Sequence, residues 1–245
     1  MKISVLTIFP EMYSPLKESL VGKALEKGLV RVDIVNIRDY SANKHKKTDD
    51  YPFGGGAGMV MTPQPIHDAI NAVDPERKAL RIYMSPKGKT LDQETVVRLA
   101  SADELLLLNG AYEGVDQRVI DLDIDEELSI GDYVLTSGDL ASMVVIDALM
   151  RYIPGVLGSE ESTSEESFSE PLLEYPQYTR PQNFMGLEVP EVLISGHHAQ
   201  IAAWRLKESI KLTEQRRPDL IEKYNRINET KKINKNSKNN KNKEK

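Results

Sequence analysis

The chain has 245 residues, the length of one large domain or of one large and one small domain. It contains no cysteine, which excludes disulfides, thiolate metal sites, iron–sulfur clusters and a cysteine nucleophile. No apolar run approaches the roughly 18 residues of a membrane span, and no secretory signal is visible. We therefore expect a cytoplasmic protein that does not enter a membrane.

Charge is divided unevenly along the chain. The formal net charge is −6, but residues 231–245 hold seven Lys and one Glu, so the preceding 230 residues carry −12. A segment of Lys and Asn with a single Ile buries too little apolar surface to offset the entropy lost on ordering. We predict a disordered basic tail over residues 231–245.

The first 158 residues alternate between strand and helix patterns. A helix is predicted over residues 90–100, because Leu91, Thr95 and Leu99 recur on one face. Alternation of this kind is typical of an α/β fold with a mostly parallel sheet covered on both faces. Apolar or alternating runs predict the strands of that sheet at residues 3–9, 31–37, 80–84 and 104–108.

Residues 140–152 (LASMVVIDALMRY) are apolar almost all round. A helix of this composition needs more covering protein than its own sheet supplies. The segment therefore predicts a subunit interface.

The composition changes after residue 158. Residues 159–170 contain five Glu, five Ser and one Thr, which predicts a flexible acidic linker. The pattern becomes helical again over residues 171–230, with a helix that begins near His197 and His198. Residues 197–232 carry nine Lys or Arg against five acidic residues, so this small helical domain is locally basic.

Four short motifs have some features of ligand-binding sites. Two are glycine motifs that do not match the nucleoside triphosphate or NAD patterns, and the other two are a basic run and a histidine pair. Gly88-Lys89-Thr90 ends like a phosphate-binding loop, but Tyr83 stands where that loop needs its first glycine. The cluster Gly54–Gly58 does not fit the dinucleotide pattern, and is either a flexible hairpin or a surface where backbone approaches a flat ligand. The basic run 44–47 is either solvated or a rim for RNA phosphate. Neighbouring His197 and His198 lack metal-ligand spacing, so no metal site is predicted.

Several long motifs resemble the bacterial tRNA (guanine-N1)-methyltransferase family. They occur in the order of that family over about residues 1–220, and only the Lys/Asn tail lies outside. The motifs are FPEM (9–12), RDY and KHKKTDDYPFGGGAGM (within 38–59), YMSPKGK (83–89), GAYEGVDQR (110–118), SIGDYVLTSGD (129–139), RYIPGVLG (151–158), LLEYPQYTRP (172–181) and SGHHAQIAAWR (195–205).

The resemblance implies a function and a fold. Members of the family transfer a methyl group from S-adenosylmethionine to N1 of the guanine immediately 3′ of the tRNA anticodon. It implies a SPOUT-class fold, in which the mostly parallel sheet ends in a C-terminal trefoil knot that binds the cofactor. In this chain residues 1–158 would form the knotted domain and residues 171–230 the small helical domain that binds the anticodon stem-loop. The family acts as a homodimer with shared sites, and a requirement for Mg²⁺ is left open.

Two catalytic residues follow from the resemblance. Methylation of guanine N1 needs a base for the N1 proton and a donor for the negative charge that grows on O6. Arg151 matches the arginine that supplies the positive charge. Glu166 stands where the family has an aspartate that acts as the base, and it has the same chemistry with one more methylene.

The cofactor loops also carry over from the family. Departures occur at Ala111, where arginine or histidine is common, and at Ser137, where glycine is common. The implied cofactor-binding residues are Tyr83, Met84, Ser85, Pro86, Asn109, Gly110, Tyr112, Ser129, Ile130, Gly131, Asp132, Tyr133, Val134, Leu135, Ser137 and Gly138.

Two other functions remain open from the sequence. One is a knotted methyltransferase that acts on another RNA, such as ribosomal RNA. The other is an RNA-binding module that keeps the fold without activity, because Glu166, Ala111 and Ser137 depart from the family pattern.

Overall fold

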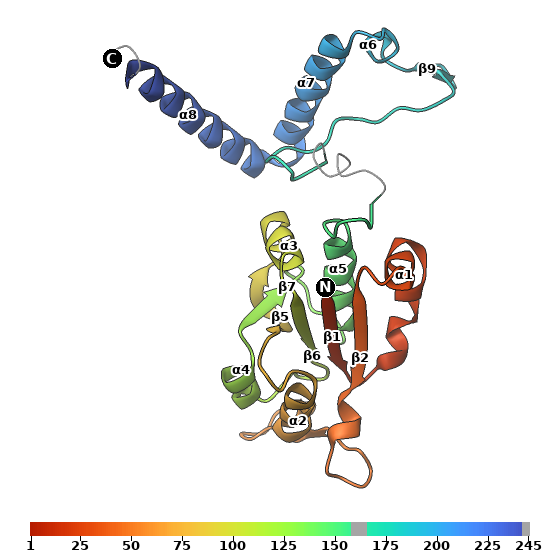
Figure 1. Ribbon diagram of the computed structural model, residues 1–245, viewed down its shortest axis with the longest axis vertical. Coiled ribbons are helices and arrows are strands. Elements are labelled where there is room, and N and C mark those ends of the chain that lie inside the picture. The colour runs from red at the N-terminus through yellow and green to blue at the C-terminus, as the bar shows by residue number, and fades with distance from the viewer. Residues whose placement is uncertain (158–165, 242–245) are drawn as a thin grey trace. The chain divides into compact units, whose positions relative to one another are not determined.

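The computed structural model describes residues 1–157 and 166–241, the last eleven of these by their backbone alone. The chain divides into two compact units, Met1–Ser159 and Glu160–Lys245 (Figure 1).

The first unit is built on one five-stranded sheet (Figure 1). Its order is β2-β1-β6-β5-β7, and every neighbouring pair is parallel. The central strands are continuous apolar runs because both of their faces are covered. The strands are β1 (Lys2–Thr7), β2 (Arg31–Asn36), β5 (Leu80–Thr90), β6 (Glu104–Asn109) and β7 (Glu126–Ser129).

Alternate side chains of each strand enter two separate cores. On β6, Leu105 and Leu107 enter one core, and Leu106 and Leu108 enter the other. The first core is covered by α1 (Ser19–Glu26), α3 (Gln93–Ala100), α5 (Asp139–Met150) and the 3₁₀ helix η1 (Pro10–Lys17). The second is covered by α2 (Pro63–Val73), α4 (Gln117–Asp123) and the 3₁₀ helix η2 (Ile37–Tyr40).

The predicted α/β class and parallel sheet are confirmed, with differences at several ends. The first strand ends at Thr7 instead of residue 9, because the Thr7 hydroxyl accepts the Phe9 amide at 2.8 Å and turns the chain. The helix predicted from residue 90 begins at Gln93, because the Asp92 side chain caps it by accepting the Thr95 amide at 2.8 Å. Four elements, α1, α2, α4 and β7, were not predicted from the sequence.

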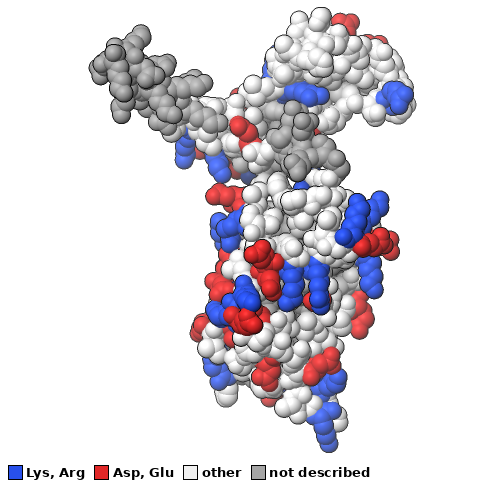
Figure 2. Space-filling model, in the orientation of Figure 1, with Lys and Arg blue, Asp and Glu red and all other residues white. Residues whose placement is uncertain are grey.

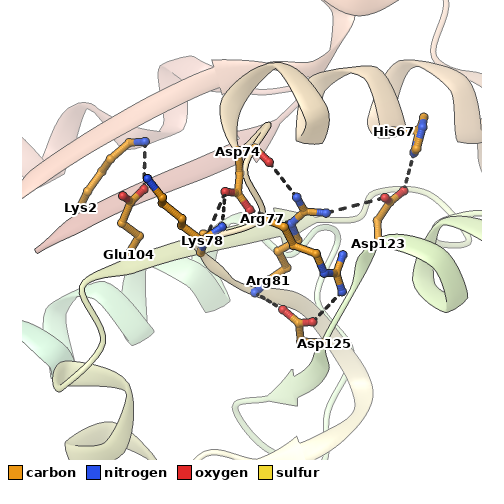
Figure 3. A network of polar contacts seen from close by, with 10 residues as sticks. Lys2, His67, Asp74, Arg77, Lys78, Arg81, Glu104, Asp123 and Asp125 are labelled. Atoms are coloured by element: carbon orange, nitrogen blue, oxygen red, sulfur yellow. Dashed lines mark hydrogen bonds and ion pairs between the residues drawn. The ribbon is translucent and has the colours of Figure 1, made fainter.

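A network of buried charges ties β5 to its neighbours on the α2 and α4 side (Figure 3). Arg81 of β5 is 3% exposed and donates to the Asp74 carboxylate at 2.8 Å. Its guanidinium also lies 3.8 Å from Asp123, which in turn contacts His67 at 2.8 Å. The backbone N–H of Arg81 donates to Asp125 at 2.9 Å. These carboxylate partners offset the free-energy cost of burying the Arg81 guanidinium.

The described part of the second unit begins with a turn, which is followed by a short ribbon and then by helices. Of the linker predicted at 159–170, residues 158–165 lie outside the described residues, whereas the amide of Ser169 donates to the carbonyl of Glu166 at 3.2 Å. A two-stranded ribbon of β8 (Asn183–Phe184) and β9 (Leu187–Glu188) precedes α6 (Glu191–Ile194), α7 (His198–Arg216) and α8 (Pro218–Lys241).

The last helix differs from the expected disordered tail. The backbone of α8 is helical to Lys241, although we expected irregular chain from residue 231. Lysine is a good helix former, and no Gly or Pro follows Pro218 to end the helix. The side chains of residues 231–245 lie outside the described residues, so the role of the tail stays a prediction.

The carboxyl end of β5 makes an arch beside β7. Met84 and Lys89 both pair with Leu128, so the four residues between them leave the ladder. At Gly88 the two backbones come very close, because a Cβ there would lie 2.4 Å from the amide nitrogen of Leu128. Only glycine fits this crossing without a shift of the strands.

We expect Gly88→Ala to destabilise the first unit by about 1–3 kcal/mol, because the added methyl meets backbone that cannot move aside easily. The thermal unfolding midpoint of the full chain should fall by several degrees. Lys89→Ala, which removes an exposed side chain from the same strand, is the control and should change stability by less than about 0.5 kcal/mol. Equal midpoints for the two variants would contradict the close crossing.

Candidate functional site

A pocket of about 230 Å³ opens at the carboxyl ends of β5, β6 and β7. Its walls are residues 83–87 of β5, the loops that follow β6 and β7, and the first turns of α4 and α5. Ligands of parallel α/β proteins bind at this edge of the sheet. The volume exceeds the ~30 Å³ share of one water severalfold, so the pocket suits an organic ligand.

The pocket brings together most of the residues that the sequence analysis assigned to a cofactor. Two of the assigned residues are not in its wall: Asn109 is buried beneath it, and Asp132 is exposed on the loop after β7. The assigned residues that line the pocket are Tyr83, Met84, Ser85, Pro86, Gly110, Tyr112, Ser129, Ile130, Gly131, Tyr133, Val134, Leu135, Ser137 and Gly138.

The loop after β7 is shaped by its own hydrogen bonds. The Ser129 hydroxyl accepts the amide of Gly131 at 3.1 Å, and the amide of Tyr133 donates to the carbonyl of Gly131 at 2.9 Å. Gly131 has φ +149°, and a Cβ there would lie 2.6 Å from the Tyr133 ring. The tight turn places Ile130 and Leu135 in the wall as apolar surface.

Two loops of the pocket are joined to each other directly. The amide of Gly138 donates to the carbonyl of Gly110 at 2.9 Å, and Ala111 forms a β-bridge with Ser137. The loop after β6 also lies against the ring of Tyr83, since a Cβ on Gly110 would be 2.7 Å from the phenol oxygen. Burial and the neighbouring Glu127 carboxylate raise the pKa of Tyr83, so its phenol stays neutral.

A buried polar cluster lies beneath the joined loops. Asp139, the first residue of α5, is 1% exposed. Its Oδ1 accepts hydrogen bonds from the hydroxyls of Thr7 at 2.6 Å and Tyr13 at 2.9 Å, and its Oδ2 accepts the Ser137 hydroxyl at 2.7 Å. The Asn109 amide donates to the Tyr13 oxygen at 2.6 Å and more weakly to Asp139 at 3.3 Å. Burial raises the pKa of Tyr13, and the Asp139 carboxylate raises it further, so Tyr13 remains a neutral donor.

The glycine cluster lies next to the pocket. It connects the short strands β3 (Asp49–Asp50) and β4 (Val60–Met61), and a Cβ on Gly58 would lie 2.5 Å from the side chain of Glu113, which lines the pocket. Gly54, Gly55, Gly56 and Gly58 all have φ between +78° and +124°, which other residues rarely adopt.

The two proposed catalytic residues are in different units. Arg151 directly follows α5, whose first turn lies at the pocket. Because α5 has 12 residues, Arg151 is roughly 18 Å along the helix axis from that turn. Glu166 belongs to the second unit, where it lines a cavity of about 270 Å³ together with Glu170, Glu174 and Arg205. The pocket of one chain therefore does not contain Arg151.

Several pocket residues were missed by the sequence analysis. Glu113 stood within a quoted motif but was given no role, although its carboxylate is the acidic group of this wall. Asp139, which lies beneath the pocket and not in its wall, ended another motif, where an acidic residue at the start of a helix is usually an ordinary partner of the helix dipole. The other lining residues outside the assigned set are Lys87, Ala111, Gly114, Val115, Gln117, Ile120, Leu128, Thr136 and Ala141.

On the face seen in Figure 2, the Lys and Arg side chains of the first unit are interspersed with Asp and Glu. Within residues 1–157 and 166–241, no group of three or more His, Asp or Glu side chains is placed to hold a metal ion. No helix of this described part has the length and apolarity to cross a membrane.

The fold and the pocket define an α/β protein of the parallel-sheet type, with a ligand-sized cavity at the strand carboxyl ends. Over residues 1–223 the sequence matches the family described as tRNA (Guanine-1)-methyltransferase TrmD, and the chain belongs to that family.

Curated relatives agree with this assignment over nearly their whole length. The chain is 56% identical to the tRNA (guanine-N(1)-)-methyltransferase of Clostridium perfringens (strain SM101 / Type A) over 223 residues, which cover 91% of this chain and 94% of the relative. It is 53% identical to the Clostridium acetobutylicum protein of the same name over 95% and 96% of the two chains. Identity to the Clostridioides difficile protein of that name is 52%, over 92% and 99%.

Proposed function

We propose that this protein transfers a methyl group from S-adenosylmethionine to N1 of the guanine immediately 3′ of the anticodon in tRNA. The observation that carries the proposal is the coincidence of the family match with the pocket. The match spans residues 1–223, and most of the residues that the resemblance assigned to the cofactor line one cavity.

The pocket chemistry fits a nucleoside with a charged tail. Backbone groups of the loops after β6 and β7 can hydrogen-bond an adenine edge, and Ile130 and Leu135 offer apolar contact to its faces. Glu113 and the Ser85 hydroxyl supply polar groups in the same wall. The bound donor would supply an activated methyl group, because a sulfonium leaves readily as a neutral thioether.

We further propose that this region is a trefoil knot of the SPOUT class. Three features support the proposal: the arch of residues 85–88, the crossing at Gly88, and the return of residues 130–138 to the loop after β6. The chain then enters α5 on the same side of the sheet as α1 and α3.

Glu166 and Arg151 are proposed to carry the chemistry on guanine. The donor would supply its methyl carbon to N1, and its sulfur would leave with the electron pair of the carbon–sulfur bond. The Glu166 carboxylate accepts the N1 proton, and the Arg151 guanidinium donates to O6, where negative charge grows. The glycine cluster beside Glu113 would let backbone approach the flat face of the guanine.

The active form is proposed to be a homodimer. Arg151 lies at the end of α5 away from the pocket of its own chain, so a second chain must supply it if the arginine acts on substrate in that pocket. Leu140 and Val144, one helical turn apart on α5, are 47% and 48% exposed and offer an apolar surface for the second copy. The second unit, residues 171–230 in our assignment, would hold the anticodon stem-loop.

The proposed function predicts methyl transfer to one nucleotide of tRNA. With S-adenosylmethionine, the full chain should methylate a tRNA that carries guanine 3′ of the anticodon and should not methylate the same tRNA with adenine there. Methylation of ribosomal RNA but not of this tRNA would favour the other substrate. Binding of tRNA without any methyl transfer would favour the RNA-binding module.

The base assignment predicts a loss of rate in Glu166→Gln. Glutamine keeps the size of the side chain but cannot accept the proton, so single-turnover methyl transfer should slow by about 10²-fold or more. Arg151→Ala should slow it by roughly 10²- to 10³-fold, as loss of one preorganised donor does elsewhere. Glu161→Gln, a neighbouring acidic residue, is the control and should be near neutral. A Glu166→Gln rate within threefold of wild type would move the search for the base to Glu165 or Glu174.

The shared site predicts complementation between inactive variants. Light scattering should give a dimer at micromolar concentration, and Val144→Glu should weaken it because a charge enters an apolar contact. Mixing Arg151→Ala with a variant whose pocket is blocked should restore about a quarter of the activity at most, through heterodimers with one intact site. A fully active monomer would rule out the shared site.

A further inference from the structure

The cluster around Asp139 has more partners than a helix end requires. An acidic residue in the first turn of a helix is usually exposed and is stabilised by the helix dipole alone. Asp139 is instead 1% exposed and accepts bonds from Thr7, Tyr13, Asn109 and Ser137. Within the described part of the chain, no Lys, Arg or His forms an ion pair with it. Its charge is held by neutral donors and by the start of α5.

These partners come from four segments that meet beneath the pocket wall. Thr7 ends β1 and Tyr13 belongs to η1, whereas Asn109 ends β6 and Ser137 lies in the loop before α5. Ser142, on the next turn of α5, donates to the Asn109 carbonyl oxygen at 2.7 Å and contacts Tyr13 at 3.0 Å. The network therefore links the loops after β6 and β7 to the carboxyl ends of β1 and β6.

The network adjoins the wall without reaching the ligand space. Ser137 and Gly138 line the pocket, but Asp139, Tyr13 and Asn109 do not. The bond from the Gly138 amide to the Gly110 carbonyl lies one residue from Asp139 and one from Asn109. Moving either of these two side chains would displace the turn that carries this bond.

We propose that Asp139, together with Tyr13, is a positioning residue that holds the loops of residues 109–112 and 129–138 in the geometry that binds S-adenosylmethionine. This rests on the proposed function for the identity of the ligand. The network holds the loops in an ordered conformation before the cofactor binds. Less of the binding free energy is then lost in ordering the loops.

Two substitutions weaken the network with little change in volume. Asp139→Asn replaces the Oδ2 acceptor of the Ser137 hydroxyl by an N–H donor and removes the charge. Tyr13→Phe removes the hydroxyl that joins Asn109 to Asp139. In each variant the Kd for S-adenosylmethionine, measured by calorimetry well below the unfolding midpoint, should rise about tenfold or more. At saturating cofactor the single-turnover rate should stay within about threefold of wild type, because the bound ligand reorders the loops.

The chain offers a matched control in Asp123. Its side chain is 5% exposed and belongs to the buried network of Arg81 and His67 (Figure 3). Asp123 does not line the pocket. Asp123→Asn therefore removes a buried carboxylate of comparable kind. It should lower the unfolding midpoint and leave the Kd for S-adenosylmethionine within twofold of wild type.

Hydrogen exchange tests the same idea without any cofactor. In the cofactor-free full chain, amides of residues 129–138 should exchange about tenfold faster in Asp139→Asn and Tyr13→Phe than in wild type, and at the wild-type rate in Asp123→Asn. Unchanged exchange and an unchanged Kd in the first two variants, with a lower unfolding midpoint, would overturn the proposal and leave the network a purely structural role. A wild-type chain that fails to bind S-adenosylmethionine would refute the proposed function instead, and the exchange rates would still decide the positioning role.

Discussion

The hydrogen bond from the Gly138 amide to the Gly110 carbonyl is the constraint on which the site depends. In the sheet β5 lies between β6 and β7, so the chain that leaves β7 must cross the end of β5 to reach the loop after β6. The arch of residues 85–88 takes β5 out of its ladder at this point, and Gly88 lets the backbone of β5 return close to Leu128 of β7. The pocket lies where β5 and the loops after β6 and β7 meet. The order of the strands in the sheet therefore also determines where the ligand site lies.

The residues that line the pocket are different from the residues proposed to act on guanine. The pocket is made largely of backbone and apolar surface on rigid strand ends, which suits a donor that arrives already activated. The groups proposed to act on guanine lie elsewhere: Arg151 follows the far end of α5, and Glu166 belongs to the second unit. In the proposed function, a second chain and the RNA would bring those groups to the pocket.

The sequence alone predicted the part of the fold that repeats a regular pattern. Continuous apolar runs such as Glu104–Asn109 are strands that are buried on both faces, and their alternation with helices predicted the parallel sheet. Short elements such as α4 and β7 were missed because seven or four residues hold too little periodicity. Most of the pocket residues were assigned through the family motifs, since turns after strands have no pattern of their own. Asp139 and Tyr13 were missed because their role depends on contacts across 126 positions of sequence.

The departure at Ser137 is explained by this buried network. On the sequence alone, a serine in place of the family's common glycine cast doubt on side-chain contacts in the loop. In the structure its hydroxyl donates to Oδ2 of Asp139 at 2.7 Å, whereas the other three donors to that carboxylate all approach Oδ1. A carboxylate has two oxygens to satisfy when it is buried, and each oxygen left without a donor is costly. The serine therefore completes the coordination of Asp139 from within the cofactor loop itself, and links a residue of the pocket wall directly to the group that holds that wall in place.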